Sequence, residues 1–341
     1  MAALDRQRHS LASELESVRP QGPVRTSIAV VIPCYRARSS IIEVIRRIGP
    51  QAGHIIVVDD ACPQSSGQKV REEIADSRVE VLFNPQNLGV GGSVIAGYRR
   101  ALELGATICV KIDADGQMDP ELLPRFVAPI LSGEADYAKG NRFFHVRDVQ
   151  GMPALRLLGN AALSFLSKLS SGYWNIFDPT NGYTAIHASC LRYVELDKLD
   201  KRYFFESDLL FRLHLIEAVV VDVPMRAIYE GEKSSLNPLR EIFRFGTFHV
   251  RNLLKRVFYE YFLRDFNLAS LQLSGGVSLL AFAVLYGGAT WYHNWARGVE
   301  SPAGTVGIVS IAMIVGFVLL QGFLAFDYAR IPRLAMHRRL D

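Results

Sequence analysis

Short apolar runs alternate with helix-like segments along the first third of the chain. The apolar runs, which predict strands, cover residues 27–35, 54–61, 79–84 and 107–112. Apolar positions three and four residues apart predict helices over 39–48, 66–75 and 87–105. Strands that alternate with helices favour an α/β fold with a mostly parallel sheet covered on both faces.

The pattern changes near the end of the chain. Residues 268–296 and 301–326 contain no Asp, Glu, Lys or Arg. Each stretch is long enough to cross the roughly 30 Å hydrocarbon core of a membrane as a helix. We predict transmembrane helices over 268–292 and 302–326. The alternative is a pair of buried core helices in a soluble protein.

Basic residues flank this pair of segments. The loop between them carries one arginine, whereas the outer flanks carry Arg251, Lys255, Arg256, Arg264, Arg330, Arg333, Arg338 and Arg339. The positive-inside rule therefore predicts a multi-pass protein of the cytoplasmic (inner) membrane. Both termini, the domain over 27–236 and the basic tail over 327–341 are expected in the cytoplasm.

Residues 237–267 interleave aromatic with basic side chains. This pattern predicts an amphipathic helical region at the membrane interface, where cations meet anionic lipid headgroups. The alternative is a helix packed on the globular domain with its basic face in water. Residues 1–26 lack the apolar core of a signal peptide and are expected to form a tail.

Composition narrows the class of function. The net charge of +4 is too small to indicate a nucleic-acid partner. The four cysteines are scattered, with no CxxC or Cys/His cluster. We therefore expect reduced thiols and neither a disulfide framework nor a zinc site.

Two aspartates follow the fourth predicted strand, in "KIDADGQMDPELL". In an extended segment, Asp113 and Asp115 would point the same way and leave coordination positions open. Two carboxylates, with Gln117 nearby, suit Mg²⁺ or Mn²⁺ held partly by substrate phosphates. An ordinary turn in which Asp caps backbone amides is the alternative. An EF-hand is excluded because its glycine and glutamate positions are not matched.

A glycine-rich stretch, "NLGVGG", opens the helix predicted over 87–105. Glycines at a helix start are typical of phosphate-binding turns. The stretch matches neither G-x-G-x-x-G nor a P-loop. Close packing of strand and helix is the alternative explanation.

Taken in order, six motifs resemble family 2 glycosyltransferases with a GT-A fold. They are "VVIPCYRA", "IIVVDDACPQSSG", "NPQNLGVGGSVIAGYRRAL", "KIDADGQMDPELL", "KGNRFF" and "FDPTNGYTAI". With two predicted spans at the end of the chain, the protein resembles polyprenyl-phosphate glycosyltransferases, the group that includes dolichol-phosphate mannose synthase. The resemblance implies a Rossmann-like cytoplasmic domain that uses a nucleotide-diphosphate sugar and Mg²⁺ or Mn²⁺.

The resemblance also implies roles for individual residues. Ala61 and Cys62 depart from the Gly-Ser that often follows the paired aspartates, which puts the contacts of that loop in doubt. Nucleotide contacts are implied for Pro33, Tyr35, Asp59, Asp60, Asn87 and Gly89, metal contacts for Asp113, Asp115 and Gln117, and phosphate contacts for Arg142, Lys233 and Ser234. Lys139 lies near Arg142 in the sequence, but the resemblance gives less reason to assign it a phosphate contact.

Acidic residues at the start of a predicted helix, Glu206 and Asp208, bear on the acceptor. Many family 2 enzymes have an acid here that deprotonates an acceptor hydroxyl. A polyprenyl phosphate is already ionised, since a phosphomonoester has a second pKa of roughly 6. We therefore place Asp208 in the catalytic site, with Asp115 and Arg142, and leave its role open. Asp178 is a further cleft candidate, and complementing the helix dipole is the alternative role of the two acids.

These observations predict an inverting glycosyltransferase that transfers a sugar to undecaprenyl or dolichyl phosphate. Its partners would be the nucleotide sugar, the polyprenyl phosphate and membrane lipids. A transferase acting on a hydroxyl of a lipid-linked glycan is one alternative. A catalytically silent nucleotide-sugar-binding module is another. Glycines in the two spans would permit close helix packing, within or between chains, so a homo-oligomer is possible.

Overall fold

The computed structural model describes residues 26–144, 154–226 and 238–340. Its centre is one sheet with strand order β3-β2-β1-β4-β6-β5-β7. The strands are β1 (Ile28–Cys34), β2 (His54–Asp59), β3 (Val79–Phe83), β4 (Ile108–Lys111), β5 (Tyr137–Asn141), β6 (Thr184–His187) and β7 (Val220–Pro224).

The sheet is mostly parallel, as the sequence predicts. β1 pairs in parallel with β2 and β4, β2 with β3, and β5 with β7. β6 alone is reversed among the described strands, lying antiparallel to both β4 and β5. The carboxyl ends of β1, β2 and β4 therefore meet at one edge of the sheet, where open α/β sheets bind ligands.

Helices cover both faces of the sheet. They are α2 (Ile41–Arg46), α3 (Ser66–Glu73), α4 (Val90–Glu103), α5 (Leu123–Leu131), α7 (Ala154–Ser171), α8 (Ala188–Tyr193) and α9 (Phe205–Leu215), with short 3₁₀ turns at Pro120–Leu122 and Leu196–Lys198. Alternate residues of β1 serve the two cores: Val30 and Ile32 pack in one, and Ala29 and Val31 in the other. The apolar run of β1 is continuous because this strand is buried on both faces.

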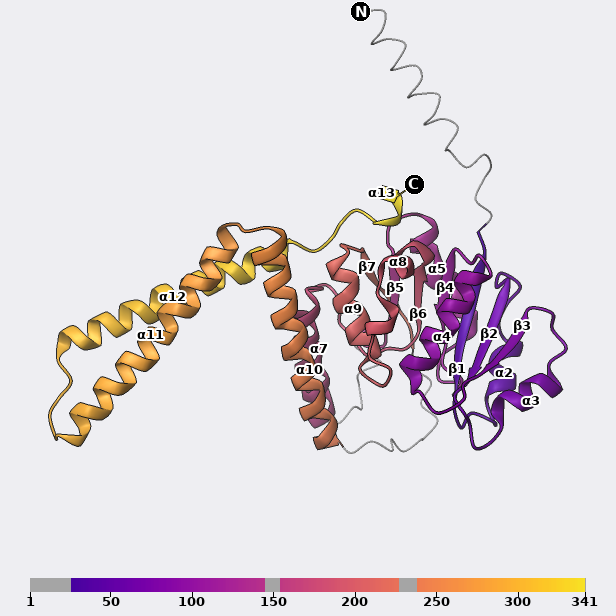
Figure 1. Cartoon of the computed structure of the whole chain (residues 1–341), viewed down its shortest axis with the longest axis horizontal. Coiled ribbons are helices and arrows are strands. Elements are labelled where there is room, and N and C mark those ends of the chain that lie inside the picture. The colour runs from indigo at the N-terminus through magenta and orange to yellow at the C-terminus, as the bar shows by residue number, and fades with distance from the viewer. Residues whose placement is uncertain (1–25, 145–153, 227–237, 341) are drawn as a thin grey trace, which may run out of the picture.

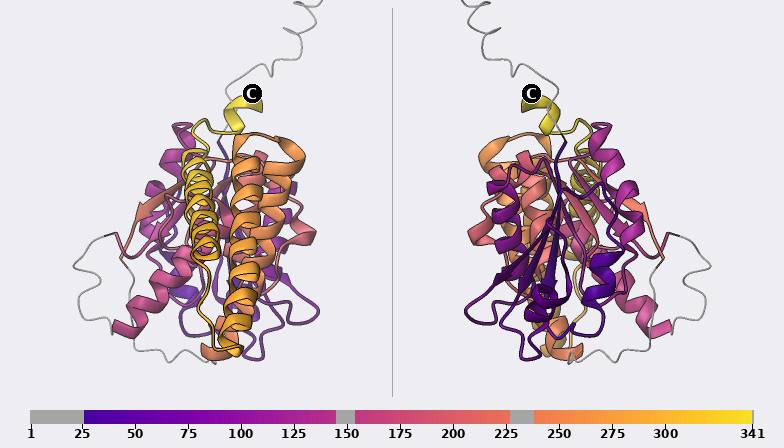
Figure 2. Two further views of the ribbon diagram at one scale, coloured as in Figure 1. Left: turned by 90° about the vertical axis from the view of Figure 1, so that its left-hand side faces the viewer. Right: turned by 90° about the vertical axis from the view of Figure 1, so that its right-hand side faces the viewer.

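The end of the chain leaves the globular domain as a helical hairpin (Figure 1). α11 (Leu268–Ala296) and α12 (Ala303–Ala329) pack side by side along their length (Figure 2). Between hairpin and domain lies α10 (Pro238–Phe258), which packs on α7 and α9 and continues into the π-helical segment η3 (Tyr259–Arg264).

The hairpin helices are not core helices of the domain. In their most apolar windows, 22% and 11% of the residues are buried, whereas a core helix is mostly buried. Both helices are long and apolar enough to span a membrane, which supports the predicted spans over the core-helix alternative.

After α12 the chain returns to the globular domain and ends in α13 (His337–Leu340) (Figure 1). The buried Asp136 carboxylate, just before β5, accepts hydrogen bonds from the backbone N–H groups of Met336 and His337 at 2.7 and 2.9 Å. The predicted basic tail is therefore docked on the domain.

Candidate active site

The paired aspartates lie in a turn directly after β4. Asp113 keeps 28% of its side chain exposed, and Asp115 is exposed. The turn begins at Ala114, so strand alternation does not by itself orient the two carboxylates. Gly116 has φ of +83°, and the Asp115 carboxylate accepts a hydrogen bond from the Gln117 N–H at 2.9 Å. Asp115 thus does cap a backbone amide, as the turn alternative proposed.

A buried lysine joins this turn to helix α9. The Lys111 ammonium, 1% exposed, lies 2.8 Å from Asp113 Oδ1 and 3.1 Å from Glu206 Oε1. It also donates to the Gly182 carbonyl at 3.2 Å. Burial alone would lower the pKa of Lys111, but the charges of Asp113 and Glu206 raise it above its ordinary value. Sequence reasoning missed Lys111, although a lysine closing an apolar strand was a signal for it.

The two acids of α9 have different surroundings. Glu206 contacts Lys111 and through it the Asp113 carboxylate. Asp208 is fully buried and accepts hydrogen bonds from the Asp200 N–H at 3.1 Å and from the Asn252 amide at 2.9 Å. Within the part of the chain that the structure describes, Glu206 rather than Asp208 connects α9 to the aspartate turn.

The aspartates at the end of β2, Asp59 and Asp60, hold the loops of the nucleotide side. Asp59 accepts from the N–H groups of Cys62 and Gly67, both at 2.7 Å. Asp60 accepts from Leu88 and Gly89 N–H, both at 2.8 Å. Their predicted contacts with base or ribose stay predictions. In this structure the two carboxylates shape the loops that would surround a nucleotide.

The other predicted nucleotide contacts lie around the same loops. Pro33 is buried within β1, whereas Tyr35, just after that strand, is exposed. Asn87 donates from its amide to the Asp60 carbonyl at 3.4 Å.

The glycine-rich turn packs closely on the segment before α9. Gly89 has φ of +85°, and a Cβ there or at Gly91 would clash with the backbone carbonyls of Lys201 and Asp200. The Gly92 N–H donates to the Lys201 carbonyl at 2.9 Å. Close packing on the backbone of residues 200–201 accounts for Gly89 and Gly91, whereas the sequence alternative named packing between strand and helix.

Arg142 forms a two-point ion pair with Asp178. Its Nε and Nη2 lie 2.8 and 3.0 Å from the two carboxylate oxygens, and Asp178 is buried. Two residues predicted to line the cleft are thus brought together. Nearby, burial lowers the pKa of Lys139 to about 8, and its ammonium donates to the Asn181 carbonyl. Lys233 and Ser234 lie outside the described residues.

The donor set fits a hard divalent cation only in part. Asp113 and Asp115 offer carboxylate oxygens at an open edge, which suits Mg²⁺ or Mn²⁺ with substrate oxygens completing the shell. Within the described ranges, no group of three or more His, Cys, Asp or Glu side chains is arranged to hold a metal. Asp113 is also engaged by Lys111. The protein alone therefore does not present a closed metal site.

A mostly parallel seven-stranded sheet with an acidic D-x-D turn at the carboxyl end of β4 is typical of a GT-A fold. The crystal structure of glucosyl-3-phosphoglycerate synthase from Mycobacterium tuberculosis, solved with Mn²⁺, UDP and glucosyl-3-phosphoglycerate, shares this fold. Its TM-score is 0.51 at 20% identity, covering 70% of this chain and 85% of that one.

Sequence comparison gives the family. Residues 29–194 match the family described as "Glycosyl transferase family 2". The chain is 33% identical to undecaprenyl-phosphate mannosyltransferase of Micrococcus luteus, over 58% of this chain and 82% of the relative. It is 32% identical to polyprenol monophosphomannose synthase of Mycolicibacterium smegmatis, over 67% of this chain and 88% of that relative. It is 30% identical to UDP-N-acetylglucosamine–dolichyl-phosphate N-acetylglucosaminyltransferase of Methanococcus voltae, over 59% of this chain and 86% of that relative. The chain belongs to glycosyltransferase family 2 and is similar to its polyprenyl-phosphate sugar transferases.

Proposed function

We propose that this protein transfers a sugar from a nucleotide-diphosphate sugar to a polyprenyl phosphate, with inversion at the anomeric carbon. The observation that carries the proposal is the D-x-D turn at the ligand-binding edge of a chain whose last helices form an apolar hairpin. A membrane-embedded acceptor explains why one chain combines these two features. The relatives named for undecaprenyl, polyprenol and dolichyl phosphates support the same acceptor class.

The reaction is a single displacement. A phosphate oxygen of the acceptor forms a bond to the anomeric carbon as the bond to the nucleotide diphosphate breaks, and the electron pair leaves with the diphosphate. A divalent cation, when bound, neutralises the charge that develops on the leaving diphosphate. Asp113 and Asp115 would hold it. Bound Mn²⁺ or Mg²⁺ in the structural neighbours supports this cofactor class.

Protein side chains would orient the reactants. Arg142, fixed by Asp178, presents a guanidinium suited to phosphate oxygens. Lys111 holds Glu206 beside the aspartate turn. Because the acceptor phosphate is already ionised near neutral pH, the reaction does not require a general base. Asp208, which is buried in its own hydrogen-bond network, would then act by holding the 200–208 segment.

The test uses purified protein in detergent with undecaprenyl phosphate, Mg²⁺ and a panel of UDP-, GDP- and dTDP-sugars. Mass spectrometry would detect the glycosylated lipid phosphate. We expect product with a subset of donors, loss of product with EDTA, and recovery on adding Mn²⁺. Asp115→Asn is expected to reduce the rate at least about 100-fold, because it removes a carboxylate that would hold the metal.

Asp197→Asn is the matched control, since Asp197 is an exposed aspartate paired with Arg99 on the surface. It should leave the rate unchanged. Product formed equally well by Asp115→Asn would contradict the proposed site. Transfer to a lipid-linked glycan hydroxyl, with none to undecaprenyl phosphate, would contradict the proposed acceptor. Nucleotide binding without transfer to either acceptor would favour the silent module.

A further inference from the structure

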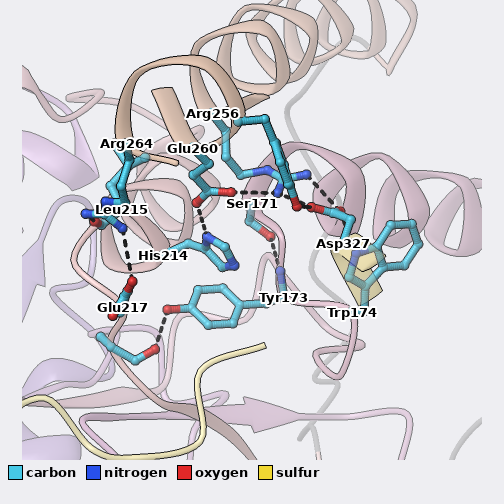
Figure 3. Close-up of polar contacts among 12 residues, drawn as sticks. Ser171, Tyr173, Trp174, His214, Leu215, Glu217, Arg256, Glu260, Arg264 and Asp327 are labelled. Atoms are coloured by element: carbon cyan, nitrogen blue, oxygen red, sulfur yellow. Dashed lines mark hydrogen bonds and ion pairs between the residues drawn. The ribbon is translucent and has the colours of Figure 1, made fainter. Parts of the chain in front are cut away.

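A buried cluster of charged side chains joins the membrane hairpin to the globular domain (Figure 3). Arg256 of α10 is 1% exposed and Asp327, near the end of α12, is 2% exposed. Their contact has two points, with Nη1 2.6 Å from Oδ1 and Nη2 3.0 Å from Oδ2. This planar, two-point geometry fixes both the distance and the angle between α10 and α12.

Aromatic donors from two further elements complete the shell of Asp327. The Tyr261 hydroxyl of η3 donates to Oδ1 at 2.6 Å, and the indole of Trp174, which follows α7, donates to Oδ2 at 2.9 Å. The Tyr261 ring also packs edge-on against Phe323 of α12. A carboxylate from the hairpin is thus held by donors from α10, from η3 and from the turn that follows α7.

Arg256 is fixed from the domain side as well. Its Nη2 donates to the Leu169 carbonyl of α7 at 2.9 Å, and its Nη1 donates to Glu260 at 3.1 Å. The other Glu260 oxygen lies 2.5 Å from Nδ1 of His214 on α9. The buried cluster around Arg256 and Asp327 therefore connects α7, α9, α10 and η3 to the hairpin helix α12.

The same face of α10 reaches toward the candidate active site. His249, Asn252 and Arg256, spaced by three and four residues, form what we call the α10 polar stripe. His249 pairs with Ser170 of α7 at 2.7 Å, and burial lowers the pKa of this imidazole to about 4, so it stays neutral. Asn252 donates to Asp208 of α9 at 2.9 Å.

From Asp208 the connection continues to the nucleotide side. Its carboxylate accepts from the Asp200 N–H, and the neighbouring Lys201 carbonyl accepts from Gly92 in the glycine-rich turn. One helix face therefore links the base of the hairpin to the loops around the candidate site. Apolar packing alone would allow sliding, whereas the directional polar contacts of this series favour one arrangement.

We propose that Arg256 and Asp327 are positioning residues that hold the hairpin at one orientation to the glycosyltransferase domain, so that the candidate active site meets the acceptor phosphate at the membrane surface. The inference rests on the proposed function. A phosphate attached to a membrane-embedded prenyl chain can lie only within a narrow range of distances from the membrane surface. A change in the angle between hairpin and domain would therefore misplace it relative to the donor.

The first experiment measures orientation without requiring activity. Spin labels at Glu72→Cys on α3 and Val299→Cys at the hairpin tip would report one distance by pulsed electron–electron double resonance. The native cysteines are buried, which favours selective labelling. We expect a narrow distribution in the parent protein, reconstituted in vesicles, and a shifted or broadened one in Asp327→Asn. Asp265→Asn, in an exposed ion pair with Arg330 at the hairpin base, is the matched control and should stay narrow.

A second variant guards against misfolding. Replacing both partners, in Arg256→Met with Asp327→Leu, removes the two opposite charges of the pair together, while Glu260 keeps its contact with His214, and is expected to keep the protein folded. It would still lose the two-point contact, so its distance distribution should also broaden. An unchanged distribution in both the single and the double variant would overturn the proposal.

The second experiment separates acceptor positioning from general damage. The acceptors are undecaprenyl phosphate in phosphatidylglycerol-containing vesicles and a short, water-soluble prenyl phosphate. For Asp327→Asn we expect kcat/KM to fall at least about tenfold on the vesicle acceptor and less than about twofold on the soluble one, because only the first depends on membrane geometry. The donor KM should not change.

Equal losses on both acceptors would overturn the positioning role and leave a merely structural one. If the parent protein glycosylates neither phosphate, the proposed function fails. The spin-label distances would still decide whether Arg256 and Asp327 set the orientation.

Discussion

At the residue scale, several side chains that match the family motif also hold the backbone together. Asp59 and Asp60 each accept two backbone N–H groups, and Gly89 and Gly91 let the glycine-rich turn approach the backbone of residues 200–201. A substitution at these positions changes loop geometry before it changes any contact with a ligand. Activity measurements on them therefore need a stability measurement beside them.

Gly91→Ala tests the packing role of the glycine-rich turn. The new methyl group would clash with the Asp200 carbonyl, which is backbone and cannot rotate away. We expect a loss of about 1–3 kcal/mol in unfolding free energy, from overpacking. Thermal unfolding in detergent would measure it.

Gly246→Ala is the control for that substitution. Gly246 lies inside α10, and a Cβ there would meet no atom within 4 Å. Alanine should be neutral or stabilise the protein by about 0.5–1 kcal/mol, because glycine is unfavourable inside a helix. Equal unfolding temperatures for both variants would argue against close packing at the turn.

At the scale of elements, α10 combines features of both sequence interpretations. Its polar stripe is buried against α7 and α9. On the other side, Val250, Leu254 and Phe258 are exposed at intervals of four residues. An exposed apolar row next to the hairpin suits a membrane interface. The predicted interfacial location remains a prediction that this arrangement supports.

The hairpin helices approach each other through small residues. A Cβ on Gly276 of α11 would lie 3.0 Å from the Gly316 carbonyl of α12, whereas a Cβ on Gly288 would meet nothing within 4 Å. The sequence prediction that glycines permit close packing within the chain is thus met at Gly276 and Gly316. At Gly288 no neighbour of this chain requires a glycine.

Gly276→Leu should separate α11 from α12. The larger side chain forces the backbones apart, which we expect to cost about 1–3 kcal/mol. Circular dichroism during heating in detergent would show a lower unfolding midpoint. Gly288→Leu is the matched control, and a lowered midpoint in both variants would contradict a specific contact at Gly276.

At the scale of the whole molecule, the hairpin projects from the domain while the tail docks back on it (Figure 1). The start of α11 and the end of α12 therefore both lie at the end of the hairpin that adjoins the domain. Two membrane spans joined by a short loop are expected to begin and end on the same face in this way. This arrangement agrees with the charge distribution in the sequence, which predicts that domain and tail lie in the cytoplasm.

Cysteine labelling tests this topology. In cytoplasmic-membrane vesicles of the two orientations, a membrane-impermeant maleimide should modify Val299→Cys only when the outer face is accessible. Glu72→Cys should react only in inverted vesicles. The native cysteines, being buried, give little background. Labelling of both sites from the same face would contradict a membrane-spanning hairpin.

The sequence by itself determined the features that local chemistry encodes. Continuous apolar runs identified β1, β2, β3 and β4, because strands buried on both faces admit few polar residues. Two long uncharged stretches identified α11 and α12 for a related reason, since hydrocarbon excludes charge. The order of the motifs pointed to the family, and the aspartate pair at the end of β4 pointed to the candidate ligand-binding edge of the sheet.

Only the tertiary structure decided which distant residues meet. The antiparallel pairing of β4 with β6, the contact of Lys111 with Glu206 and the pairing of Arg256 with Asp327 join positions 71 to 95 residues apart in the chain. No local pattern marks such pairs, because burying a charge is favourable only when a partner arrives from elsewhere in the fold. Strand pairing and helix packing bring these partners together, and they fix the role that each candidate residue can play.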